Sequence, residues 1–202
     1  MRVVAALIAL AMLGGIDLVR PSPAAAQESP DPSECQVEPR DDAWIADVIA
    51  TPAVAVASPA ALPATPVPAD ALPGGEPAGP DALFGINQTM RELVACVNAG
   101  DTQRALALLT DDASRETVVA LFGVAIVSGP IPDATPTPLP ADEQLPFFSI
   151  RDPRVLEDGR VGAIVSDDTR PDYAFFIVFV EEDGRWLIDE AVATEAGGAA
   201  GP

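Results

Sequence analysis

Tyr173 and Glu190 are the residues of this chain best suited by type and position to proton chemistry. Tyr173 is the only tyrosine and begins a strongly apolar predicted strand. Glu190 shares strand parity with Trp186 and Ile188, so it is expected on the same face as those two apolar residues. A carboxylate in such surroundings has a raised pKa and can act as an acid or base. The alternative is a solvated charge at the end of a strand.

The residue types that are absent exclude several mechanisms. The chain has no histidine and no lysine, because all 11 basic residues are arginine. This rules out Ser-His-Asp and Cys-His nucleophiles, HExxH zinc sites, the P-loop lysine and Schiff-base lysines. The acidic runs Asp167–Asp168 and Glu181–Asp183 match no calcium-loop spacing. We therefore predict no metal and no cofactor, and we lean away from an enzyme.

The net charge is −20, from 31 acidic and 11 basic residues. An acidic surface repels phosphate backbones and anionic lipid heads. Nucleic acid and membrane surfaces are therefore excluded as expected partners.

The N-terminus has the features of a secretory signal over residues 1–26. Arg2 is followed by an apolar run too short to span a bilayer, and Ala24-Ala25-Ala26 fits a cleavage site. The alternative is an uncleaved N-terminal anchor. The signal and the arginine-, alanine- and proline-rich composition predict a bacterial protein that is secreted or held in the cell envelope.

Two cysteines, Cys35 and Cys96, remain in the exported chain. An even count in an exported protein indicates a disulfide. A bridge between them would close a loop of about 60 residues and contribute roughly 4 kcal/mol in the chain-entropy model. The alternative is two unpaired thiols.

Residues 27–80 form an N-terminal arm. A short amphipathic helix is predicted at about 41–50, where Asp41 and Asp42 can cap the start and one face carries Trp44, Ile45, Val48 and Ile49. It is too short to be stable alone, so it docks on its own domain or on a partner. The Pro/Ala-rich stretch 51–80 is predicted to be an extended, unpacked linker, acting as a stalk or without a role.

The globular part is predicted to cover residues 81–193, followed by a flexible tail at 194–202. Helical spacing runs from Leu83 to Val97, Gly100 ends that helix, and Asp101 caps a second one. The C-terminal part is predicted as strands with turns at Asp158-Gly159 and Asp183-Gly184. The fold class is therefore α+β, with N-terminal helices against an antiparallel sheet of about four strands.

The segment from Tyr173 to Glu181 is apolar on both faces. A strand in a sheet with one solvent-exposed face alternates apolar and polar residues, and this segment does not. Both faces of the sheet must therefore be covered. One face is expected to pack on the helices. The other requires the N-terminal arm or a second copy of the domain, which would be a homodimer through the sheet.

Three stretches together resemble the NTF2-like (SnoaL-like, ketosteroid isomerase-like) superfamily over residues 81–193. They are Asn98–Asp101 between the helices, Leu109–Asp112 at the end of the second helix, and the closing strand Asp183–Asp189. The resemblance implies a curved sheet wrapped around helices as a cone with an internal pocket. In this chain the pocket is expected to be lined by a set of apolar residues: Phe84, Met90, Phe122, Phe175, Trp186 and Ile188.

The matching stretches are cap, turn and core positions, so they predict the fold and leave the activity open. The leading hypothesis is an exported, non-catalytic module that binds a small apolar ligand or a partner protein. One alternative is an isomerase or lyase that uses carboxylates and Tyr173, as the ketosteroid isomerases use a carboxylate base and a tyrosine. Another is a structural protein of the cell envelope.

Overall fold

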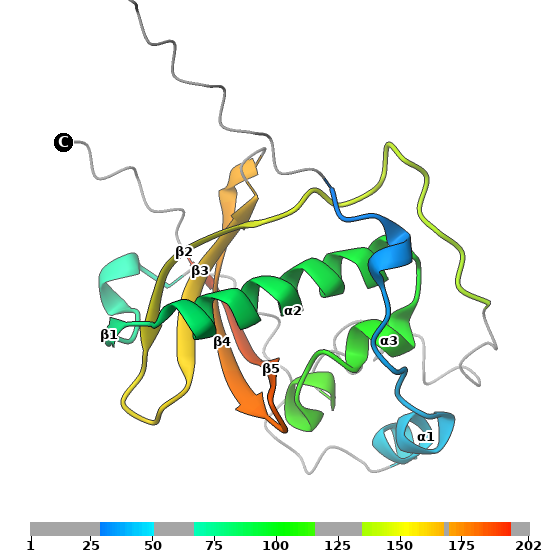
Figure 1. The fold of residues 1–202 in the computed structure, drawn as a ribbon, viewed down its shortest axis with the longest axis horizontal. Coiled ribbons are helices and arrows are strands. Elements are labelled where there is room, and N and C mark those ends of the chain that lie inside the picture. The colour runs from blue at the N-terminus through cyan, green and yellow to red at the C-terminus, as the bar shows by residue number, and fades with distance from the viewer. Residues whose placement is uncertain (1–28, 51–66, 116–134, 168–169, 195–202) are drawn as a thin grey trace, which may run out of the picture.

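A computed structural model describes residues 29–50, 67–115, 135–167 and 170–194 (Figure 1). The predicted signal at 1–26, most of the linker, Phe122 and the tail beyond Thr194 lie outside these residues. The elements in chain order are η1 Pro32–Glu34, α1 Asp42–Ala50, η2 Ala69–Ala71, β1 Glu76–Pro77, α2 Pro80–Asn98, α3 Thr102–Leu106, β2 Ser149–Val155, β3 Val161–Asp167, β4 Arg170–Glu182 and β5 Arg185–Thr194.

The strands form one antiparallel sheet in the order β1-β2-β3-β4-β5, which confirms the α+β class. The β2–β3 and β4–β5 turns lie where the two Asp-Gly pairs predict. At the β4–β5 turn Asp183 and Gly184 both have positive φ, 51° and 77°, as a two-residue turn of type I′ requires. The prediction of about four strands is wrong, because the described sheet has five. The additional strand, β1, is only two residues long and contains Pro77, so it carries no strand pattern in the sequence.

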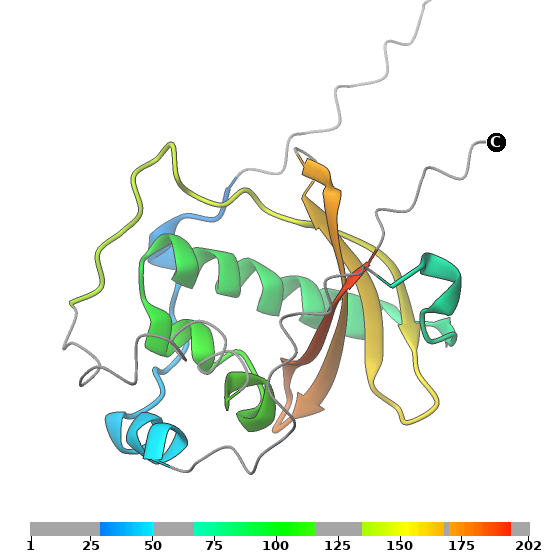
Figure 2. The ribbon, with the colours of Figure 1, turned by 180° about the vertical axis from the view of Figure 1, so that it is seen from behind.

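The core lies between α2 and the concave face of the sheet (Figure 2). Helix α2 buries one stripe of apolar residues that follows the helical period. The stripe meets Phe179 at the centre of the sheet, where the aromatic ring is fully buried. The other fully or almost fully buried apolar side chains of this cluster are Ile86, Met90, Ala95, Cys96, Leu108, Val161, Ala163 and Val165.

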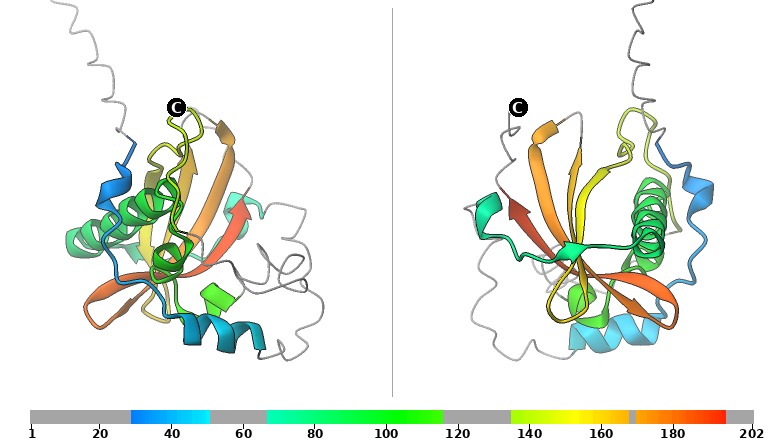
Figure 3. Two further views of the ribbon diagram at one scale, coloured as in Figure 1. Left: turned by 90° about the vertical axis from the view of Figure 1, so that its right-hand side faces the viewer. Right: turned by 60° about the vertical axis from the view of Figure 1, so that its left-hand side comes forward.

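The opposite face of the sheet is covered by a segment that the sequence predicts as unpacked linker. Leu72 packs against a second apolar cluster formed by Phe176, Val178 and Leu156. Val67 bridges to Thr194 at one sheet edge, and β1 pairs with β2 at the other. Figure 3 shows η2 and α2 on opposite sides of the sheet. The expectation that this stretch is unpacked is therefore wrong for residues 67–77, and the chain itself covers Phe176 and Val178 without a second copy.

The N-terminal arm is fastened along α2 by the predicted disulfide. Cys35 and Cys96 are bonded and both are buried, which confirms the bridge. Beside it, the Arg91 guanidinium donates two hydrogen bonds to the carboxylate of Glu34, at 2.6 and 2.8 Å. The Arg91 hydrogen bonds hold the pKa of Glu34 below its usual value of 4.5. We call residues 29–37 the strap.

Helix α1 follows the strap and lies against the domain, which is the intramolecular alternative for this amphipathic helix. The Asp41 carboxylate accepts a hydrogen bond from the Trp44 backbone at 2.6 Å and caps the helix start. Ile45 is buried. Gln103 of α3 donates to the Asp42 carboxylate at 2.7 Å, and Arg40 lies over the Trp44 ring, 4.5 Å from its centroid.

The end of α2 is a junction where the strap and the 135–146 loop meet. Asn98 is fully buried, and its amide nitrogen donates to the carbonyl oxygens of Leu145 and Pro30 at 3.2 and 3.4 Å. Its side-chain oxygen accepts from the Leu145 backbone at 2.8 Å. Gly100 follows with φ of 68°, and a Cβ there would collide with the Thr137 carbonyl oxygen. Only glycine therefore ends this helix without strain.

Among the helices of the described residues, none is long and apolar enough to cross a bilayer.

Candidate functional site

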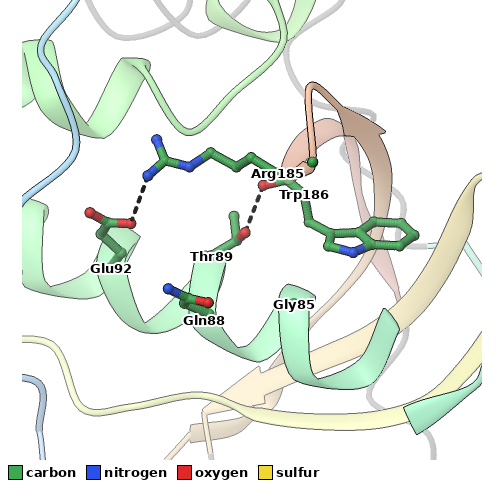
Figure 4. Close-up of a pocket in the computed structure, with 7 residues that line it drawn as sticks. Gly85, Gln88, Thr89, Glu92, Arg185 and Trp186 are labelled. Carbon is green, nitrogen blue, oxygen red and sulfur yellow. Dashed lines mark hydrogen bonds and ion pairs between the residues drawn. The ribbon is translucent and has the colours of Figure 1, made fainter. Parts of the chain in front are cut away.

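A cleft of about 130 Å³ lies between α2 and the β4–β5 hairpin (Figure 4). One wall is the part of α2 that carries Gly85, Gln88, Thr89 and Glu92, and the other is the hairpin from Gly184 to Trp186. The cleft lies at the rim of the sheet, on the side that α2 covers. We call it the hairpin cleft.

Two contacts fix the width of the hairpin cleft. The Thr89 hydroxyl donates to the Trp186 carbonyl oxygen at 2.6 Å and joins the helix to the strand. The edge of the Trp186 indole reaches α2 at Gly85, where even a methyl side chain would have no room, because a Cβ would collide with Cδ1 of Trp186. A glycine inside a helix usually costs stability, so this one has a packing reason.

Replacing Gly85 with alanine is expected to lower the free energy of unfolding by about 1–3 kcal/mol, because the new methyl group overpacks against Trp186. In an open helix interior the same change would stabilise by about 1 kcal/mol. Urea unfolding therefore tests this packing, because the free energy of unfolding should fall if Gly85 contacts Trp186 and rise if it does not. Gly74→Ala is the control, since nothing lies within 4 Å of a Cβ there. A stabilised Gly85→Ala variant would contradict the contact.

Glu92 and Arg185 face each other across the hairpin cleft at 3.7 Å. The Glu92 side chain is only 13% exposed, whereas that of Arg185 is 46% exposed. Glu92 also accepts a hydrogen bond from the Gln36 backbone at 3.3 Å, so the strap helps to hold it. A carboxylate, a guanidinium and an indole thus line one small opening.

The most exposed large apolar side chain of the described residues is Phe84, at 73%. It precedes Gly85 on α2 and lies one helical turn before Gln88, which lines the hairpin cleft. Leu83 beside it is also exposed. Phe84 does not contribute to core packing, because the core lies on the other side of α2.

Of the six residues predicted to line an internal pocket, the five that the structure describes do not meet in one cavity. Met90 and Ile188 are buried in the core, and Phe175 packs partly buried against it. Trp186 lines the hairpin cleft, and Phe84 is exposed on α2. Phe122 falls outside the described residues.

The predicted orientation of Glu190 is wrong. The pairing of β4 with β5 shifts register between Val178 and Phe179, so that Ile188 lies opposite Phe179 and Glu190 lies opposite Val178. This bulge at Asp189 reverses the parity of the strand, and Glu190 is exposed on the face away from α2. Tyr173 belongs to β4, and its side chain is not among those described.

The bulge residue Asp189 is held by its neighbours. Its carboxylate accepts from Thr110 Oγ1 at 3.1 Å and from Arg160 at 2.6 Å. The hydrogen bonds to Asp189 and Asp158 raise the pKa of Arg160, and the backbone and side chain of Arg160 lower the pKa of Asp158. Glu190 lies 3.8 Å from the same guanidinium. Each charged group of this cluster thus has a partner, and the cluster serves to link strands.

Within the described ranges, no group of three or more acidic or cysteine side chains could hold a metal ion.

The hairpin cleft was missed from the sequence. The sequence feature that could have indicated the cleft is Gly85 within the helical pattern of α2. An isolated glycine in a helix often marks the close approach of another element. Which element approaches depends on the tertiary packing.

The chain matches no protein-family model, no curated protein and no solved structure.

Proposed function

We propose that this protein is an exported, non-catalytic module of the NTF2-like type that binds a partner protein through Phe84 and the hairpin cleft. The exposure of Phe84 is the observation that carries the proposal, because aromatic side chains displayed on rigid elements are typical anchors of protein interfaces. The adjoining cleft supplies polar groups for specificity. The hydrogen bond from Thr89 to Trp186 keeps this surface preformed.

The packing favours a binding site on the surface over one inside the domain. Met90 and Ile188, expected to line an internal pocket for a small apolar ligand, are enclosed by core side chains. For an isomerase, Glu190 would have to face the interior, and it lies on the opposite face. The disulfide supports export, since such bonds persist in oxidising compartments.

Site-specific cross-linking in the organism that encodes the protein tests this function. A benzoylphenylalanine at Gln88, exposed in the hairpin cleft, is expected to capture one protein species on illumination. Phe84→Ser in the same chain is expected to abolish that capture. The same photoreactive residue at Glu157, exposed in the β2–β3 turn, is the control.

Capture at Glu157 as efficient as at Gln88, or capture that survives Phe84→Ser, would exclude the proposed surface. Native mass spectrometry of the purified protein gives a second readout. A retained small molecule with no bound protein would instead support a ligand-binding cone.

A further inference from the structure

The aromatic surface beside the hairpin cleft is bordered by carboxylates. Asp81 is exposed and lies one helical turn before Phe84. Glu181 is exposed and lies directly opposite Trp186 in the pairing of β4 with β5, so both project from the same face of the sheet. Neither carboxylate has an ion-pair partner among the residues that the structure describes.

Two basic side chains near this surface already have acidic partners. Arg185 pairs with Glu92 in the hairpin cleft, and Arg91 pairs with Glu34 of the strap. Elsewhere in the described parts of the chain, ion pairs to carboxylates also engage a further set of arginines: Arg40, Arg104, Arg115, Arg154 and Arg160. The surface around Phe84 therefore carries net negative charge.

The negative charge of this surface favours some kinds of binding partner over others. A second copy of the chain also has a net charge of −20, so two copies would meet with like charges. A cationic partner gains from the field, and its guanidinium or ammonium group can lie against an aromatic ring. Arginine suits such a surface because its planar group both stacks on aromatic rings and pairs with carboxylates.

We propose that the occupant is a cationic segment of another protein, with an arginine at the hairpin cleft between Trp186 and Glu181 and an apolar neighbour on Phe84. This inference rests on the proposed function and specifies the chemistry of the partner. The cleft volume of about 130 Å³ accommodates the end of one side chain, while Phe84 and Leu83 offer the apolar contact outside it.

Titration of the ¹⁵N-labelled full chain with the peptide acetyl-Leu-Arg-Arg-Leu-amide tests the inference. Chemical-shift changes are expected at residues 82–92 and 181–186. The double variant Asp81→Asn/Glu181→Gln is expected to weaken binding about tenfold, which corresponds to about 1.4 kcal/mol. Phe84→Ser should weaken it similarly. The peptides acetyl-Leu-Gln-Gln-Leu-amide and acetyl-Leu-Glu-Glu-Leu-amide should not bind.

The matched control is Asp142→Asn/Glu143→Gln, which removes the same charge from exposed positions in the 135–146 loop. It should change the affinity less than about twofold, because it alters only the long-range field. Equal weakening by the two double variants would overturn the inference, as would shifts spread over all exposed acidic residues or equal binding of the neutral peptide.

The outcomes for the two proposals are separable. If cross-linking at Gln88 depends on Phe84 but the arginine peptide does not bind, the cationic partner is wrong and the proposed function stands. If cross-linking is independent of Phe84 and the peptide does not bind, both are wrong.

Discussion

Replacing both Cys35 and Cys96 with alanine is expected to lower the free energy of unfolding by about 4 kcal/mol. The bridge joins residues 61 apart in sequence, so its removal releases a long loop in the unfolded chain. Both positions are buried, and the change also loosens the strap that supports Glu92. Urea unfolding monitored by circular dichroism measures the difference.

Two controls accompany the cysteine variant. Addition of reductant to the unfolding assay should lower the stability of the native sequence to that of the variant and leave the variant unchanged. Glu34→Gln, which removes only the exposed ion pair with Arg91, should cost less than about 1 kcal/mol. A double-alanine variant as stable as the native chain would show that the non-covalent contacts of the strap are sufficient.

Asn98→Ala is expected to cost about 3 kcal/mol, because it removes three hydrogen bonds that a fully buried side chain makes to the backbone. The Leu145 N–H and the Pro30 carbonyl oxygen lose the Asn98 side chain, and the Leu145 carbonyl oxygen keeps the hydrogen bond from the Ser29 hydroxyl at 2.8 Å. The variant should therefore destabilise the strap and the 135–146 loop together. Urea unfolding gives the cost, and amide hydrogen exchange at Leu145 shows whether the loop is released.

The matched control for Asn98 is Asn87→Ala on the same helix. Asn87 also donates a side-chain hydrogen bond, to the Leu83 carbonyl oxygen at 2.8 Å, but it is not buried. Its loss should change the stability by less than about 0.5 kcal/mol. Equal costs for the two variants would mean that Asn98 is not the junction between the two segments.

The candidate site was only partly predictable. Phe84 and Trp186 were expected to share an internal pocket, and they are found instead on the exposed surface of α2 and in the hairpin cleft. The helical period already places Phe84 off the apolar stripe of α2, but whether another element covers its side chain depends on how the helix packs in the fold. Glu92 and Arg185 could not be paired from the sequence, because they are far apart in the chain and meet through packing alone.

Features that depend on neighbouring residues and on composition could be predicted without any coordinates. The Asp-Gly turns, the helix end at Gly100, the cap at Asp101 and the antiparallel α+β class all follow from local conformational preferences. The pairing of Cys35 with Cys96 followed from there being only two cysteines.

Long-range contacts set the features that interrupt those local patterns. The bulge at Asp189 inserts one unpaired residue and turns Glu190 to the opposite face, and no periodicity in β5 records it. Residues 67–77 cover the second face of the sheet although proline and alanine give them no strand or helix pattern. These residues are held on the sheet because burying Phe176 and Val178 is favourable. The burial requires contact between two segments that are distant in the chain, so the sequence of either segment alone does not predict it.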